Sequence, residues 1–65
     1  MLTNILKELR MRRYMLNQKE FSRILGVSEA QYSRYESKTA QPSLEIAIKI
    51  SIALNMTVND IWKFE

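Results

Sequence analysis

Residues 18–37 read QKEFSRILGVSEAQYSRYES, and this stretch decides the fold of the chain. Asn17, immediately before it, stands three residues ahead of Glu20, which is the spacing of a reciprocal capping box at the start of a helix. Gly26 ends that helix, because glycine enters the left-handed conformation without a Cβ clash. The sequence therefore predicts a helix of about eight residues that ends in a turn.

The capping-box spacing recurs two residues after the glycine. Ser28 and Gln31 predict a second helix that runs to about Ser37. Two short helices joined by a three-residue turn that opens with glycine form a helix-turn-helix unit. Ser22 provides the small residue where the two helices cross, and the positions expected to face inward are Phe21, Leu25, Val27, Tyr32 and Tyr35.

Helices are predicted on both sides of this unit. Residues 4–14 carry an apolar face formed by Ile5, Leu6 and Leu9. Pro42 closes a polar stretch, and Ser43 then caps a helix that is apolar nearly all round, which we expect at the centre of the fold. Asn55-Met56 is the next break, and a last short helix carries Val58, Ile61 and Trp62. The fold class predicted is all-α, a compact single domain of five short helices over residues 1–65, with the second helix burying Phe21, Ile24 and Leu25.

The composition removes most other classes of protein. The chain has 65 residues and neither Cys nor His, so disulfides and thiolate zinc sites are excluded and the commonest catalytic side chain is missing. With only seven carboxylates to build a metal site or a general base, we expect no enzyme, no cofactor and no metal. No run of about 18 apolar residues and no secretory leader are visible, so we expect a cytoplasmic protein without membrane contact.

The charge is unevenly distributed along the chain. Residues 1–41 hold eight basic and four acidic side chains, a balance of +4, whereas residues 42–65 hold two basic and three acidic ones, a balance of −1. This asymmetry suits a face that binds a polyanion. A solvated helical surface explains it equally well, so charge alone does not decide between the two.

The ordered set of short motifs resembles the Xre/Cro-type helix-turn-helix family, the lambda-repressor-like DNA-binding domains. The residues that carry the resemblance are Leu6-Lys7-Glu8-Leu9-Arg10, Asn17-Gln18-Lys19-Glu20-Phe21, Leu25-Gly26-Val27-Ser28, Ser33-Arg34-Tyr35-Glu36 and Pro42-Ser43-Leu44 leading into Ile48-Lys49-Ile50. They cover essentially the whole chain. The resemblance implies that helix 29–37 enters the major groove of double-stranded DNA and that helix 18–25 lies across the backbone.

Carried over by position, the resemblance also implies roles for individual residues. Base edges would be read by Ser28, Glu29, Ala30 and Arg34, and backbone contact or support would come from Asn17, Gln18, Gln31, Ser33, Lys38, Thr39 and Gln41. Arg34 can donate two parallel hydrogen bonds to guanine, Glu29 can accept from cytosine N4, and Ala30 can meet a thymine methyl. Purely structural interpretations stay open for three of these residues. Arg34 can be a surface arginine paired with Glu29, Glu29 can interact only with the helix dipole, and Gln31 can be only a capping residue.

Several positions depart from the family pattern. Ser37-Lys38 stands where Asn-Gly is frequent, Ala40 replaces a basic residue, and Tyr32 brings a hydroxyl that must find a partner. The chain is one residue longer between Arg10 and Gln18, with Tyr14-Met15 where a glycine is common. An ion pair between Arg10 and Glu36, frequent in the family, is plausible despite this offset.

The C-terminal residues and the motif together lead to a functional hypothesis. Met56, Trp62 and Phe64 are expected to form a homodimer interface, the alternative being a frayed hydrophobic end. The leading function is a sequence-specific transcriptional regulator, a repressor-type dimer that binds a palindromic operator. The alternative is a protein-interaction module of the same fold, such as an antitoxin-like partner.

Overall fold

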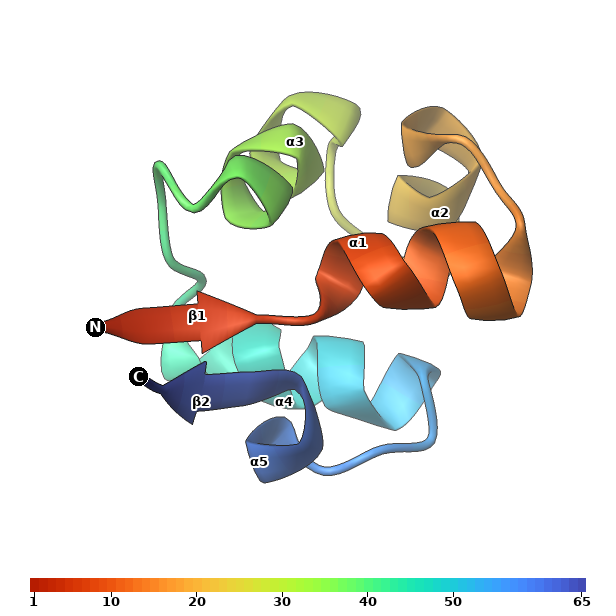
Figure 1. Ribbon diagram of the computed structural model, residues 1–65. Coiled ribbons are helices and arrows are strands. Elements are labelled where there is room, and N and C mark those ends of the chain that lie inside the picture. The colour runs from red at the N-terminus through yellow and green to blue at the C-terminus, as the bar shows by residue number, and fades with distance from the viewer.

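The computed structural model describes residues 1–65 and is mostly helical (Figure 1). Its helices are α1 (Leu6–Glu8), the π-helix η1 (Leu9–Tyr14), α2 (Gln18–Leu25), α3 (Glu29–Ser37), α4 (Leu44–Ala53) and α5 (Val58–Ile61). Counting α1 and η1 as one continuous helix gives the five helices predicted. The two remaining elements are the strands β1 (Leu2–Asn4) and β2 (Trp62–Phe64). No helix is both long enough and apolar enough to cross a membrane.

The two ends of the chain pair as a small antiparallel sheet, so the all-α prediction was wrong in this part. Leu2 lies opposite Phe64, and Asn4 lies opposite Trp62. Trp62 therefore belongs to a strand and not to the last helix, and its backbone is extended, with φ −106° and ψ 135°. Three-residue strands are too short to show an alternating pattern, and nothing local in the sequence indicates a pairing between opposite ends.

Asn4 explains why the first helix begins at Leu6 and not at residue 4. Its side-chain oxygen accepts a hydrogen bond from the Leu6 backbone N–H at 3.0 Å, while its amide donates to the Tyr35 carbonyl at 3.0 Å. Asn4 is buried. The side chain thus satisfies one unpaired donor at the helix start and joins β1 to α3.

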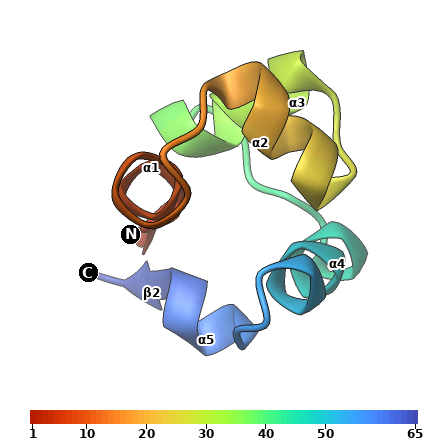
Figure 2. The same cartoon turned by 90° about the vertical axis from the view of Figure 1, so that its right-hand side faces the viewer.

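The helices surround one core (Figure 2). Its buried members are Leu6, Leu9, Phe21, Leu25, Tyr32, Tyr35, Ala47, Ile50, Leu54, Ile61 and Trp62. The Phe21 ring lies between two tyrosines, 5.2 Å from the ring centroid of Tyr14 and 5.4 Å, edge-on, from that of Tyr32. All five inward positions predicted for the helix-turn-helix unit are buried or half-buried.

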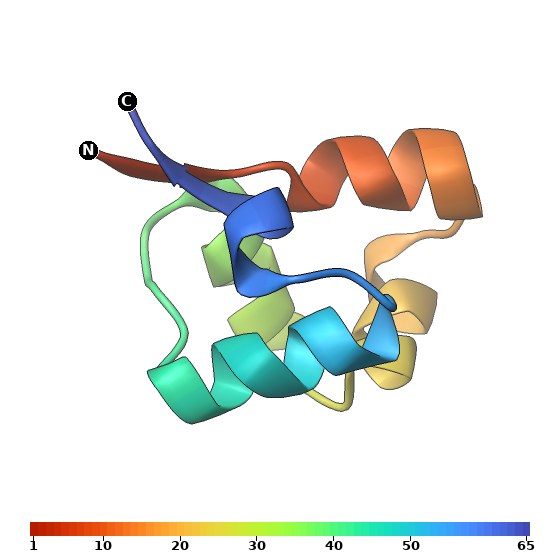
Figure 3. The same ribbon diagram turned by 90° about the horizontal axis from the view of Figure 1, so that it is seen from below.

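Two burial predictions were wrong. Ile24 on α2 is exposed, and α4 is not at the centre of the fold, since Leu44, Ile48 and Ile52 face solvent along its length. Figure 3 shows α4 along the lower edge of that view, at the periphery of the molecule, with α5 beside it. A chain of this size has too few elements to cover a helix on every side, so an all-round apolar helix keeps one flank exposed.

Candidate nucleic-acid interface

The two helices of residues 18–37 start with different caps. At α2 the predicted capping box is complete: the Asn17 side chain accepts from the Glu20 N–H at 2.8 Å, and the Glu20 carboxylate accepts from the Asn17 N–H at 3.3 Å. At α3 only half of it forms, because the Ser28 hydroxyl accepts from the Gln31 N–H at 3.1 Å without a reciprocal bond from the Gln31 side chain. Gln31 therefore presents an amide to solvent.

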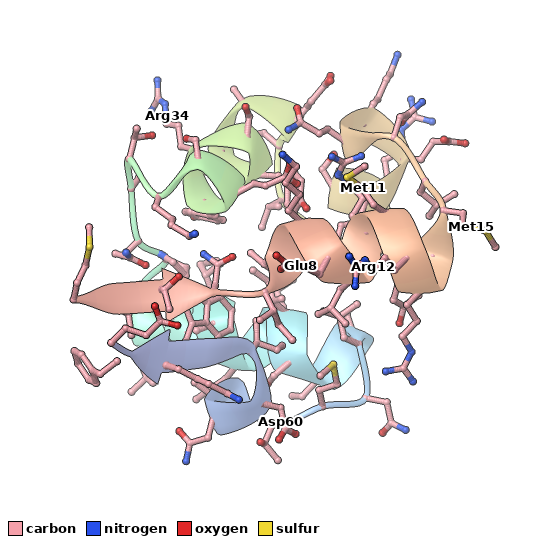
Figure 4. The ribbon with its side chains drawn as sticks, viewed as in Figure 1. Glu8, Met11, Arg12, Met15, Arg34 and Asp60 are labelled. Carbon is pink, nitrogen blue, oxygen red and sulfur yellow. The ribbon has the colours of Figure 1, made fainter.

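The outer face of α3, defined here as Ser28, Glu29, Ala30, Gln31 and Arg34, is exposed at every position. The opposite side of the helix is anchored in the core through Tyr32 and Tyr35. Arg34 forms no ion pair with Glu29, because the chain's one salt bridge joins Arg10 to Glu36. In Figure 4 the Arg34 side chain points away from the rest of the molecule. All four residues predicted to read bases are thus exposed to solvent.

Glu36 holds α3 in place through a cluster of polar side chains, which we call the Glu36 cluster (Arg10, Gln18, Tyr32 and Glu36). Arg10 donates from Nε to Glu36 Oε2 and from Nη2 to Oε1, both at 3.0 Å. Gln18 Nε2 donates to Oε1 at 3.2 Å, and the Tyr32 hydroxyl donates to Oε2. These contacts join η1 and α2 to α3, and they give the Tyr32 hydroxyl the partner it required.

Ionisation reinforces this cluster. Burial by itself would raise the pKa of Glu36, but hydrogen bonds from Arg10, Tyr32 and Gln18 bring that pKa below its ordinary value. The hydrogen bond to Glu36 raises the pKa of Arg10, and burial together with the Glu36 carboxylate raises the pKa of the Tyr32 hydroxyl. The side chains of Arg10 and Glu36 are only 14% and 7% exposed. The pair is therefore charged and largely shielded from water at neutral pH.

The π-helix places Arg10 for this contact. Its i→i+5 hydrogen bonds enclose one more residue than the i→i+4 hydrogen bonds of an α-helix do. The helix ends at Met15, whose φ of 53° is left-handed and stands where the family often has glycine. Arg10 Nη1 also donates to the Leu16 carbonyl at 3.0 Å, so the same guanidinium fixes the segment that follows.

The segment after α3 folds back over the end of that helix. Lys38 is left-handed, with φ 66°, and the Thr39 N–H donates to the Arg34 carbonyl at 3.0 Å. The Thr39 and Ser37 hydroxyls lie 3.0 Å apart. The side chains of Lys38, Thr39 and Gln41 are exposed, and Ser33 is half-buried. A non-glycine residue thus takes the conformation that glycine often supplies.

Sequence reasoning missed one contact to the turn. Lys49 of α4 donates from Nζ to the Gly26 carbonyl at 3.3 Å, and a Cβ built on Gly26 would lie 2.9 Å from Lys49 Cε. Glycine at this position satisfies both φ 75° and the approach of the lysine. Spacing gave no indication of this contact, because its partners are 23 residues apart.

The three residues expected at a dimer interface differ in exposure. Phe64 is exposed, Met56 is half-buried and Trp62 is buried against the chain's own core. Trp62 and Phe64 belong to β2, and Met56 precedes α5. No group of three or more acidic, His or Cys side chains that could hold a metal is present.

Comparison with known proteins gives one finding. A family model described as helix-turn-helix, that of the Xre/Cro/lambda-repressor-like domains, matches residues 6–61. The match contains α2, the turn and α3 together with the helices on either side. No curated protein matches the chain significantly.

Proposed function

Because the chain belongs to the Xre/Cro/lambda-repressor-like helix-turn-helix family, a family of DNA-binding regulators, we propose that it is a repressor-type regulator that binds a palindromic operator as a dimer. The observation that carries this proposal is the outer face of α3. Its side chains are exposed and its one cation is unpaired, while its inner side is fixed by two core tyrosines and Glu36. A rigid helix with an uncommitted polar face is suited to reading the major groove.

Each exposed position on this face has a chemical role in the proposal. Arg34 donates two hydrogen bonds to guanine O6 and N7, and Glu29 accepts from cytosine N4. Ala30 contacts a thymine methyl, and Ser28 and Gln31 lie beside them at the helix start. Since Arg34 has no protein partner to give up, a contact with a base costs it no existing ion pair.

The residues around the helix have supporting roles. Lys38, Thr39 and Gln41 contact phosphates from the segment after α3, with Asn17 and Ser33 at the edges of the interface. Gln18 acts through Glu36, because its amide already donates to that carboxylate. Phosphate contacts fix the register of the protein, whereas base contacts select the sequence.

A comparison of three alanine variants tests this assignment. Arg34→Ala should weaken binding to the selected site by about 1–3 kcal/mol and relax the preference at one base pair. Lys38→Ala should weaken binding to all sequences alike and reduce the slope of log K against log salt by about 1. Arg12→Ala is the matched control, because Arg12 is also exposed but lies on η1 (Figure 4). If neither Arg34→Ala nor Lys38→Ala changes binding to any DNA, the regulator assignment is wrong.

Dimeric binding is the second part of the proposal. Two copies related by a two-fold axis present two α3 helices to half-sites about one helical turn apart. Met56, Trp62 and Phe64 are the residues proposed for the contact between copies. Selection of bound sequences from a random DNA pool should return an inverted repeat. Single, unpaired half-sites would show that the chain binds as a monomer.

A further inference from the structure

The turn between α2 and α3 accepts one hydrogen bond from outside these two helices. Within the unit, the Gly26 N–H donates to the Arg23 carbonyl at 3.2 Å, and the Val27 N–H donates to the Ser22 carbonyl at 3.1 Å. The Gly26 carbonyl accepts no backbone hydrogen bond, and its donor is the ammonium of Lys49, at 3.3 Å. In Figure 3 the turn lies beside α4, which carries this lysine. Lys49 therefore links the turn to a third helix.

The aliphatic part of the Lys49 side chain also covers the turn. Gly26 has a φ of 75°, and a Cβ built on it would lie 2.9 Å from Lys49 Cε and 3.1 Å from Lys49 Nζ. The lysine thus fills the space that a side chain at residue 26 would need. Its ammonium approaches the carboxyl end of α2, where a cation interacts favourably with the last carbonyls and with the helix dipole.

Lys49 forms this contact although an acidic side chain is available on its own helix. Glu45 stands four residues before it on α4, which is the spacing and the order that favour an ion pair on a helix surface. The chain's one salt bridge nevertheless joins Arg10 to Glu36, so Lys49 and Glu45 are not paired. The ammonium is thus committed to the turn and not to a carboxylate.

The contact lies near the end of α3 that the other hydrogen bonds leave free. The Glu36 cluster acts on the middle and the end of this helix, and Asn4 donates to the Tyr35 carbonyl near its end. Over residues 26–31, the one hydrogen bond from outside the helix-turn-helix unit is that of Lys49. The start of α3, where bases are expected to be read, therefore depends on the turn for its position.

We infer that Lys49 is a positioning residue for base reading, because it holds the turn that sets how the start of α3 meets the major groove. The inference rests on the proposed function, since it concerns the presentation of α3 to DNA. In this role Lys49 touches neither a base nor a phosphate. It contributes to sequence preference, because base contacts need a correctly placed helix start, whereas the proposed phosphate contacts come from the segment after α3.

Lys49→Met tests the inference, because methionine keeps an unbranched side chain but removes the ammonium and its donors. Lys7→Met is the matched control, since Lys7 is an exposed lysine of α1 without an ion pair and its loss changes the net charge equally. Lys49→Arg keeps a cation with N–H donors and should behave as the wild type. All three positions are on the surface, so urea midpoints should stay near the wild-type value.

Amide hydrogen exchange of the free protein reports on the turn itself. The Gly26 and Val27 N–H groups should exchange about 3- to 10-fold faster in Lys49→Met, the scale of one lost hydrogen bond, and at the wild-type rate in Lys7→Met. Amides in the second half of α3 should keep their wild-type rates. Unchanged exchange at Val27 would overturn the inference, as would an equal acceleration of all amides, which would indicate general destabilisation.

Binding to a selected site and to an unrelated duplex provides the second readout. Lys49→Met should bind the selected site about 3- to 10-fold more weakly, while its affinity for unrelated DNA and its slope of log K against log salt match those of Lys7→Met. A slope reduced in Lys49→Met alone would overturn the inference by revealing a phosphate contact. An unchanged preference for the selected site would overturn it as well and leave the proposed function standing.

The two readouts also separate this inference from the proposed function. If the wild type binds no DNA while exchange at Val27 is faster in Lys49→Met, the proposed function is refuted. The part of the inference that concerns the turn is then upheld, because the exchange experiment contains no DNA.

Discussion

The α2–α3 region and the region of α4 and β2 expose opposite kinds of side chain. Around α3 the surface is polar, and the helix is held from beneath by the Glu36 cluster, which joins it to η1 and α2. At the start of α4 and in β2 the surface is apolar, with Leu44 and Phe64 exposed and no ion pair to order them. One region is thus a polar surface held by partly buried hydrogen bonds, and the other is an exposed apolar surface without such bonds. A substitution that disrupts one region is therefore expected to leave the other intact.

Glu36→Gln is expected to have the largest effect and to act on the α3 region alone. It leaves the Arg10 guanidinium largely buried without its counter-charge, which should cost about 3 kcal/mol of folding free energy. DNA affinity should fall as well, because α3 loses its link to η1 and α2. Urea unfolding measures the first effect, and DNA titration at a temperature where the variant is folded measures the second.

Glu36→Gln is compared with a control variant and with a property that it should leave unchanged. Glu8→Gln changes an exposed carboxylate without an ion pair and should alter stability by less than about 0.5 kcal/mol. Dimerisation per folded molecule should remain near the wild-type level in Glu36→Gln. A parallel loss of dimer would show that the two regions are coupled.

The dependence of folding stability on pH provides a second way to distinguish the two regions, because each region holds one carboxylate with a lowered pKa. The pKa of Glu36 lies below its ordinary 4.5, and backbone and side-chain hydrogen bonds from Thr57 lower the pKa of Asp60 at the start of α5. A lowered folded-state pKa gives stability that is complete above the unfolded pKa. That stability is lost as pH falls through the folded value, so Glu36 should begin to destabilise the chain below about pH 4.5 and Asp60 only below about pH 3.8.

Urea midpoints measured from neutral pH down to about pH 3 test this expectation. Glu36→Gln should flatten the acid limb by removing its titration, and Asp60→Asn should flatten it independently, with the two changes additive because the groups lie in different regions. An acid limb that keeps its full slope in Glu36→Gln would show that the Glu36 cluster does not contribute to it.

The sequence predicted the helix-turn-helix unit well because its information is local. Asn17, Glu20, Gly26 and Ser28 act on backbone groups within one helical turn. The capping box of α2, the Ser28 cap of α3 and the left-handed turn formed where they were predicted, and only the reciprocal bond from Gln31 did not. Ser28, Glu29, Ala30 and Arg34 are all exposed, as a base-reading role requires, although their contacts with DNA stay a prediction.

What the sequence did not predict depends on distant partners. The pairing of β1 with β2 joins opposite ends of the chain, and Lys49 reaches Gly26 from another helix. The π-helix carries Arg10, whose partner Glu36 is 26 residues away along the chain. The pattern around residues 44–54 was apolar all round, and only the small number of covering elements leaves Ile52 exposed.

Lys38→Gly is expected to have the smallest effect on folding stability, and it should change stability and DNA affinity in opposite directions. Lys38 ends α3 with φ 66°, a conformation that costs a residue with a Cβ about 1 kcal/mol and costs glycine little. The variant should therefore be more stable by about that amount, yet bind all DNA sequences more weakly, because it loses a proposed phosphate contact. Lys38→Asn is the matched control, since asparagine tolerates the same conformation and also lacks the charge. Thermal unfolding and a salt titration of DNA binding provide the two readouts. Greater stability with unchanged DNA affinity would remove Lys38 from the DNA-binding surface and leave the residue at this helix end without a functional explanation.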